Sequence, residues 1–275
     1  MSHFNTTTQT GFARSASEAM FPRLFPDAGW WCPSLNPAMG GTRLWDLSRN
    51  NWGTLTSMAN DDWVVSGGKG ALDFDGSNDY VNLGQRSPFQ IDFSSRFSIS
   101  AWIKTTASSG GIIGKRVLAG WYFSIEGANV IGLILQGTSS AIIVTSVASG
   151  VSDGNWHHVA ATYTGNSNAS GISLFVDGRQ VSTTTVLNSA IGSMLNAIDT
   201  TIGAVTTNQF FLAGQLDDIR IYNRALTAGE VRQLYNVGRG NMPLRRRRRY
   251  AEQAAGFRAY WARNNSRLIG AGNVS

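Results

Sequence analysis

Short segments of alternating or β-branched residues, each closed by a glycine, asparagine or aspartate turn, fill the chain between Trp30 and Ile221. Examples are ALDFDG, YVNLG, FSISAWIKT, GWYFSIEG, VIGLILQG, HHVAATYTG and ISLFVDG. Strands of roughly four to eight residues that repeat with turn residues are typical of sandwiches and barrels. The 31 glycines and the charged fraction of only 15% also favour tight turns over helices. The pattern therefore predicts an all-β fold built from antiparallel strands.

Two segments make this prediction specific. In residues 172–180, ISLFVDGRQ, the Asp177-Gly178 pair supplies the positive φ angles that a type I′ hairpin turn requires. In FSISAWIKT, residues 97–105, Phe and Ile alternate with Ser, so that one face is apolar. Trp102 lies on the opposite face of this strand, where a loop covers it or it lines a ligand groove. Both possibilities are open at this point.

One short helix is expected after the last strand. In LTAGEVRQLYNVG, Thr227 can cap the first turn and Glu230 can return a bond to its backbone, as in a capping box. Leu226 and Val231 are placed as a hydrophobic staple, and Gly238 is expected to close the helix.

Charge divides the chain into regions. Eight arginines and one glutamate lie from Gly240 onward, so the remaining residues carry about −1 of the net charge of +6. We expect an extended N-terminal arm at 1–28, a single sandwich domain at 29–238 and a basic tail at 239–275. The sandwich itself shows no compositional sign of a nucleic-acid-binding face.

Features of a secreted or membrane protein are missing from the sequence. The single Cys32 cannot form an internal disulfide, and no signal peptide is evident at the N-terminus. No stretch approaches the roughly 20 apolar residues of a membrane helix. We therefore expect a soluble protein that is made in the cytoplasm.

Several stretches, in this order, resemble the laminin-G-like family. They are LWDLSRNNWGTLT, ALDFDGSNDYVNLG, FSISAWIKT, GNWHHVAATYTG, ISLFVDGRQV and LDDIRIYNRALTAGEVRQLYN. The fold of this family is similar to concanavalin A, pentraxins and legume lectins. The resemblance spans roughly residues 30–237 and implies an antiparallel two-sheet jelly-roll sandwich in which strands from both chain ends meet in one sheet. It implies little about function, because such modules serve as lectins, adhesins, enzyme appendages and structural domains.

A calcium site is one interpretation of the acidic residues. Asp75 and Asp79 lie in the loop DFDGSNDYV, and Asp217 begins the last strand. Oxygen ligands on a glycine-containing turn suit Ca²⁺, and members of the family often hold a calcium ion with such loops. The alternative is turn chemistry, in which Asp and Asn bond their own backbone. His157 and His158 point to opposite faces of a strand, so they are poorly placed to share a metal.

Catalysis is not expected. The related glucanases need carboxylates from one strand in a spacing like Glu-x-Asp-x-x-Glu, and none of the four glutamates has such a pattern. A Gly-x-Ser-x-Gly motif and a phosphate loop are also missing.

The first functional hypothesis is a recognition module, a free calcium-dependent lectin or adhesin among the possibilities. The chain has nine tryptophans, and aromatic faces stack on sugar rings. Trp121, in the expected loop AGWYF, is the preferred surface candidate, with Trp102 as a second. Ordinary packing is the alternative for both.

The second hypothesis is a structural protein of a larger assembly, favoured as the surface of a phage virion. Lectin-like modules normally work outside the cell, and release of virions by lysis would bring a protein without a visible signal peptide there. The arm and the tail would then contact neighbouring subunits in an oligomer or a larger particle. Glycans are possible further partners.

The tail offers a third hypothesis, nucleic-acid binding. Its five arginines, Arg245, Arg246, Arg247, Arg248 and Arg249, precede an apolar stripe. If the tail is helical, Tyr250, Ala254, Phe257 and Trp261 recur at i, i+4, i+7 and i+11. Such a stripe needs a partner surface, and the arginines favour a negative one. We therefore expect a basic amphipathic helix that docks on a neighbouring subunit, with phosphate or anionic lipid as alternatives.

Overall fold

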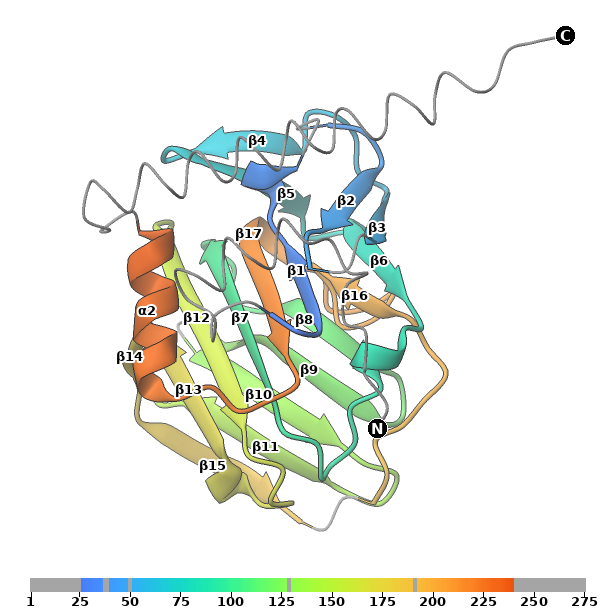
Figure 1. Ribbon diagram of the computed structural model, residues 1–275, viewed down its shortest axis with the longest axis vertical. Helices are drawn as coiled ribbons and strands as arrows, with labels where there is room; N and C mark the ends of the chain where they lie inside the picture. Colours follow the sequence, from blue (N-terminus) through green and yellow to red (C-terminus); the bar gives the residue numbers. More distant parts are fainter. Residues whose placement is uncertain (1–25, 37–39, 49–50, 128–129, 190–191, 240–275) are drawn as a thin grey trace, which may run out of the picture.

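The computed structural model describes residues 26–36, 40–48, 51–127, 130–189 and 192–239. Within them the chain forms seventeen strands and one α-helix, and the paired strands are antiparallel. Figure 1 shows two layers, with β7, β12 and β17 in one and β8 to β11 in the other. The prediction of an all-β, jelly-roll-like sandwich is confirmed.

The strands are β1 (Gly29–Trp31), β2 (Arg43–Asp46), β3 (Asn51–Thr56), β4 (Trp63–Ser66), β5 (Lys69–Asp75), β6 (Tyr80–Gly84), β7 (Phe97–Lys104), β8 (Gly110–Arg116), β9 (Gly120–Gly127), β10 (Val130–Gln136), β11 (Ala141–Ser146), β12 (Trp156–Tyr163), β13 (Ile172–Val176), β14 (Arg179–Gln180), β15 (Thr183–Asn188), β16 (Thr200–Ile202) and β17 (Ala213–Tyr222). Three short 3₁₀ turns are η1 (Pro33–Leu35), η2 (Ser87–Phe89) and η3 (Ala169–Gly171), and the helix is α2 (Ala228–Gly238).

The first layer is centred on β7, which pairs with β12 on one side and β17 on the other. Strand β13 continues the layer beyond β12. On the side of β17 away from β7, the first residues of β17 pair with β5. Its later residues pair with β1, where Trp30 lies opposite Arg220. Strands from the start and the end of the described chain therefore meet in one sheet, as the resemblance implied.

The second layer runs through β8, β9, β10, β11 and β15 in spatial order. Strand β16 pairs with both β8 and β6, and β6 pairs with β3, which links this layer to the start of the chain. The layers enclose one large apolar core, because each strand alternates its side chains between core and outer face. Phe97, Ile99 and Ile103 of β7 lie in it, as their spacing predicted.

A second, smaller core lies on the outer face of the first layer. Helix α2 packs there beside β12 and β13, burying Val231 and Leu234 against Phe175 and Ala160. The predicted capping box is present, since Thr227 accepts a bond from Glu230 N and the Glu230 carboxylate accepts one from Thr227 N. The helix includes Gly238 and is capped by Arg239, so it extends past the glycine that was expected to close it.

The predicted hairpin turn is also confirmed, since φ is 50° at Asp177 and 74° at Gly178. The arm and the tail expected at 1–28 and 239–275 lie outside the described residues, apart from 26–28 and 239. In the described part of the chain, no helix has the length and apolar character needed to span a membrane.

Candidate functional site

Five residues on the outer face of the second layer combine aromatic rings with charged and hydroxyl groups. They are Arg116, Tyr122, Ser124, Glu126 and Phe210, which we call the outer-face patch. Four of them come from β8 and β9, and Phe210 comes from the loop 203–212 between β16 and β17. Phe210 is 37% exposed, one of the few large apolar side chains at the surface of the described chain.

The alternation of β9 places three patch residues on one face. Trp121, Phe123 and Ile125 enter the core, so Tyr122, Ser124 and Glu126 must point outward. Tyr122 lies opposite Gly114 of β8 and Ile134 of β10, and Ser124 lies opposite Gly111 and Gly132.

These glycines let other groups approach the sheet closely. A Cβ atom at Gly111 would lie 2.6 Å from Val205 N, and one at Gly114 would lie 2.9 Å from Val205 Cα. The loop 203–212 therefore lies directly on the outer face of β8. A Cβ atom at Gly132 would lie 2.6 Å from Glu126 Cγ, so the Glu126 side chain extends over the neighbouring β10.

Backbone bonds fix the loop 203–212 in place. Gly111 N donates to Phe210 O at 2.8 Å, and Leu212 N donates to Gly203 O at 2.9 Å. Phe210 itself has φ 60°, in the left-handed region that costs a non-glycine residue roughly 1–2 kcal/mol. Its ring meets that of Tyr122 edge-on, with centroids 6.4 Å apart. The loop thus holds an aromatic ring at the surface at an energetic cost, a feature that clusters at ligand sites.

The charged groups of the patch surround Tyr122. The Arg116 guanidinium lies 5.2 Å from the Tyr122 ring centroid. Burial, together with the nearby Glu126 carboxylate, raises the pKa of Tyr122 to about 12, so its hydroxyl remains protonated. Burial also raises the pKa of Glu126, although the hydroxyl of Ser124 donates to its carboxylate. Ser124 is fully buried and its hydroxyl is bonded to Glu126, so it positions this carboxylate instead of facing a ligand. The patch therefore offers aromatic faces, the Arg116 guanidinium and a carboxylate acceptor, the groups that recognise a hydroxyl-rich ring.

The prediction that Trp121 is a surface ligand residue is wrong. Trp121 is 1% exposed and lies in β9, not in a loop, on the face that enters the core. Its ring packs against Phe97, and Nε1 donates to Phe89 O at 3.3 Å. The motif AGWYF pointed to the right strand, but the alternation selects its neighbour Tyr122 as the outward residue.

Trp102 does lie on the outer face of β7, but α2 covers it, leaving 3% exposed. Its ring stacks on Tyr235 with centroids 5.8 Å apart, and the Lys69 ammonium lies 4.0 Å from its centroid. Of the two possibilities left open, coverage is the one found, with a helix in place of a loop. Trp102 cannot line a groove in this arrangement.

The structure does not bring the three predicted calcium ligands together. Asp75 Oδ1 accepts bonds from Ser77 N and Asn78 N, and Asp79 Oδ2 accepts one from Asp75 N at 3.0 Å. These are the turn bonds of the alternative interpretation. Asp217 lies four residues beyond Ala213, the partner of Asp75 in β17, which is about 13 Å along the strand. No group of three His, Cys, Asp or Glu residues placed to hold a metal occurs in the described ranges. The three aspartates therefore do not fit one site, and calcium binding stays a prediction.

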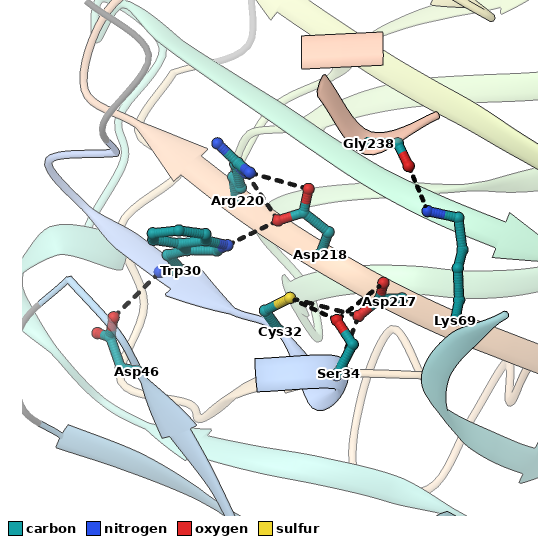
Figure 2. A network of polar contacts seen from close by, with 9 residues as sticks. All are labelled: Trp30, Cys32, Ser34, Asp46, Lys69, Asp217, Asp218, Arg220 and Gly238. Atoms are coloured by element: carbon teal, nitrogen blue, oxygen red, sulfur yellow. Dashed lines mark hydrogen bonds and ion pairs between the residues drawn. The ribbon is translucent and has the colours of Figure 1, made fainter. Parts of the chain in front are cut away.

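Asp217 instead belongs to a buried polar network that joins the first and last strands of the described chain, β1 and β17 (Figure 2). It is 3% exposed, and Ser34 and Cys32 of the η1 region donate to its carboxylate at 3.4 and 3.5 Å. Burial, reinforced by the adjacent Asp218, raises the pKa of Asp217 to about 6. Burial likewise raises the pKa of the Cys32 thiol well above its usual range, so Cys32 is not a reactive thiolate.

Asp218 is a paired carboxylate in the same network. Arg220 donates to both of its oxygens, at 2.8 and 2.9 Å, and Trp30 Nε1 donates to Oδ1 at 2.6 Å. Burial alone would raise the pKa of Asp218, but Arg220 and these hydrogen bonds lower it. A bulge between Asp217 and Arg220, with φ 52° at Asp218, interrupts the alternation of β17 here. The network is enclosed and ties β1 to β17, so we assign it a structural role.

The tail residues predicted to dock on a partner lie outside the described residues. They are Arg245, Arg246, Arg247, Arg248, Arg249, Tyr250, Phe257 and Trp261. Sequence reasoning missed the outer-face patch, since Arg116, Ser124 and Phe210 carry no local motif. The closely spaced glycines of GGIIG, residues 110–114, were the available signal for a backbone crossing over β8.

Comparisons with known proteins agree with this architecture. The binding domain of Paraclostridial Mosquitocidal Protein 1 has 16% identity and a TM-score of 0.56, over 72% of this chain and 51% of that one. The botulinum neurotoxin serotype G binding domain has 20% identity and a TM-score of 0.54, over 77% and 51%. The serotype D ligand binding domain in complex with N-acetylneuraminic acid has 16% identity and a TM-score of 0.55, over 78% and 51%.

This chain therefore spans about half the length of the solved structures that it matches, and the likeness concerns the fold. No match was found among curated proteins. A family model described as the concanavalin A-like lectin/glucanases superfamily matches residues 75–232, more than half of the chain. On that match and the sandwich described above, the chain belongs to the concanavalin A-like lectin/glucanases superfamily.

Proposed function

We infer that this chain is a non-catalytic glycan-binding module that uses the outer-face patch. The observation that carries the proposal is Phe210, a ring held at the surface at φ 60° beside Tyr122 and Arg116. A sugar ring presents an apolar face of C–H groups and an edge of hydroxyls. Aromatic rings suit the face, and the Arg116 and Glu126 side chains suit the edge.

The comparisons support binding over catalysis. The matched structures are described as binding domains, and one of them is a complex with N-acetylneuraminic acid. Hydrolysis of a glycosidic bond requires two cooperating carboxyl groups, whereas Glu126 is the sole carboxylate among the five patch residues. Display on a phage virion, with the arm and tail contacting neighbours, remains a prediction from the sequence.

A glycan array with the purified protein tests the proposal. We expect at least one glycan class to bind, and the Phe210→Ala variant to bind it about tenfold more weakly, because an aromatic contact is worth roughly 1–1.5 kcal/mol. Val65→Ala is the matched control, since Val65 is an exposed apolar residue of β4, 75% exposed and outside the patch. The melting temperature of each variant shows whether it folds.

Two results would contradict the proposal. One is an array on which the wild-type protein binds nothing. The other is a folded Phe210→Ala variant that retains the affinity of the wild type and of the Val65→Ala control.

A further inference from the structure

A second polar site is lined in part by residues of the loop 203–212. It is a pocket of about 320 Å³, in the size range of small-ligand sites. Its lining consists of Gln85, Val117, Ile198, Asp199 and the segment Thr206–Asn208, and we call it the loop pocket.

The chemistry of the loop pocket suits a neutral sugar unit. Its polar lining supplies a carboxylate, two amides and two hydroxyls, and Val117 and Ile198 supply apolar surface. Among the described residues the lining contains no lysine or arginine, and the nearby Lys115 ammonium is bonded to the carbonyl oxygens of Asn196 and Ile198. A neutral group therefore suits the pocket better than an anionic one. This combination of hydrogen-bonding groups with a small apolar wall matches a ring that carries several hydroxyls.

Hydrogen bonds hold the polar groups of the pocket in position. Asn82 Nδ2 donates to Asp199 Oδ2 at 2.8 Å, and Asn82 Oδ1 accepts from Gly84 N at 2.7 Å, which fixes the orientation of the amide. On the loop, the Thr206 hydroxyl donates to Asn208 Oδ1 at 2.7 Å, so the Asn208 NH₂ group is directed away from that bond. Groups positioned in this way lose little entropy when they bind a ligand.

Two covalent connections place the loop pocket next to the outer-face patch. Arg116 belongs to the patch and Val117 to the pocket, and consecutive Cα atoms lie about 3.8 Å apart. In the loop, a bridge between Thr206 and Gln209 makes a tight turn, and Phe210 of the patch follows at once. The two sites therefore share one wall, formed by this loop.

We propose that the loop pocket is a second sugar subsite, so that the module binds a chain of several sugar units across the loop 203–212. This inference rests on the proposed function of the patch and extends it. A single terminal sugar fills one site, whereas a longer chain contacts both. The ligand class is then a linear oligosaccharide with at least one neutral unit, and affinity depends on chain length.

The test compares short and long probes by isothermal titration calorimetry. The probes are chito-, cello- and manno-oligosaccharides of two and six units, together with the array's strongest ligand in the same two lengths. We expect the wild-type protein to bind the six-unit form of its preferred series at least tenfold more tightly than the two-unit form.

The pocket variants are Asp199→Asn and Asn208→Ala, with Phe210→Ala as the patch variant and Val65→Ala as the control. We expect each pocket variant to lose most of the tenfold advantage of the long probe while binding the short probe as the wild type does. The Phe210→Ala variant should weaken binding of both lengths.

Equal affinity for short and long probes in the wild-type protein would overturn the inference, and so would folded pocket variants that keep the length dependence. In both cases, weaker binding by Phe210→Ala would still support glycan binding at the outer-face patch. If no probe binds the wild-type protein, the inference falls together with the proposed function.

Discussion

Two buried groups near the junction of β7, β12 and β17 have opposite pKa shifts. Burial, with the charge of Asp218, raises the pKa of Asp217 from 3.8 to about 6. Burial lowers the pKa of His158 from 6.5 to about 4, against the attraction of Asp218. Stability from Asp217 is fully present below pH 3.8 and is lost as the pH rises through 6. Stability from His158 is fully present above pH 6.5 and is lost as the pH falls through 4.

Each shift corresponds to a change of about 3 kcal/mol in the free energy of unfolding, and the two changes oppose each other. We therefore expect this pair to leave the wild-type stability nearly constant between pH 7 and pH 4. Asp217→Asn removes one of the two contributions. As the pH is lowered from 7 to 4, the free energy of unfolding of this variant should fall by about 2 kcal/mol more than that of the wild type, because only the His158 contribution remains. His158→Gln should produce a difference of opposite sign.

Urea unfolding at pH 7, 5.5 and 4, followed by tryptophan fluorescence, measures these differences. Asp61→Asn is the control, because Asp61 is an exposed aspartate of similar chemistry. An Asp217→Asn variant whose free energy of unfolding parallels that of the wild type and the control at all three pH values would contradict the assignment of this pH dependence to Asp217. So would a difference of the same sign in the two variants.

Substitutions in helix α2 and calcium addition at the acidic loop, which is the turn that holds Asp75 and Asp79, should have measurable effects. Gly238→Ala places a Cβ 2.1 Å from Trp102 Nε1, so we expect it to lower the free energy of unfolding by about 1–3 kcal/mol, whereas Gly229→Ala, with 3.9 Å of room, should be neutral or stabilising. Thr227→Ala removes the cap of α2 and should cost about 1 kcal/mol in urea unfolding, against no change for Thr207→Ala. Calcium added after chelator treatment should leave the melting temperature unchanged, because backbone bonds already engage Asp75 and Asp79. A rise of several degrees would instead support the predicted calcium site.

Local patterns in the sequence were enough to predict most of the fold. Alternation in residues 97–104, the Asp177-Gly178 turn and the Thr227 cap are each determined by neighbours within a few positions, and each is found. The meeting of β1 with β17 is a long-range feature, and it came from the family resemblance.

The candidate site could not be predicted in the same way. Phe210 reaches the patch because the loop 203–212 crosses β8, a contact between segments about 90 residues apart that no local pattern encodes. Trp121 was misplaced because its segment was taken for a loop, where either neighbour can point outward. In a strand, alternation leaves only Tyr122 on that face. Trp102 was ambiguous because its cover, α2, lies more than 120 residues further along the chain.

The proposed function is tested most directly by locating a bound glycan on the surface of the protein. Amide chemical-shift changes in an NMR titration with the strongest array ligand provide this location. If the outer-face patch binds the glycan, the largest changes occur at Tyr122, Glu126 and Phe210, with smaller ones at Asn208 and Asp199. Changes confined to the acidic loop at Asp75 and Asp79, with the patch unaffected, would contradict it.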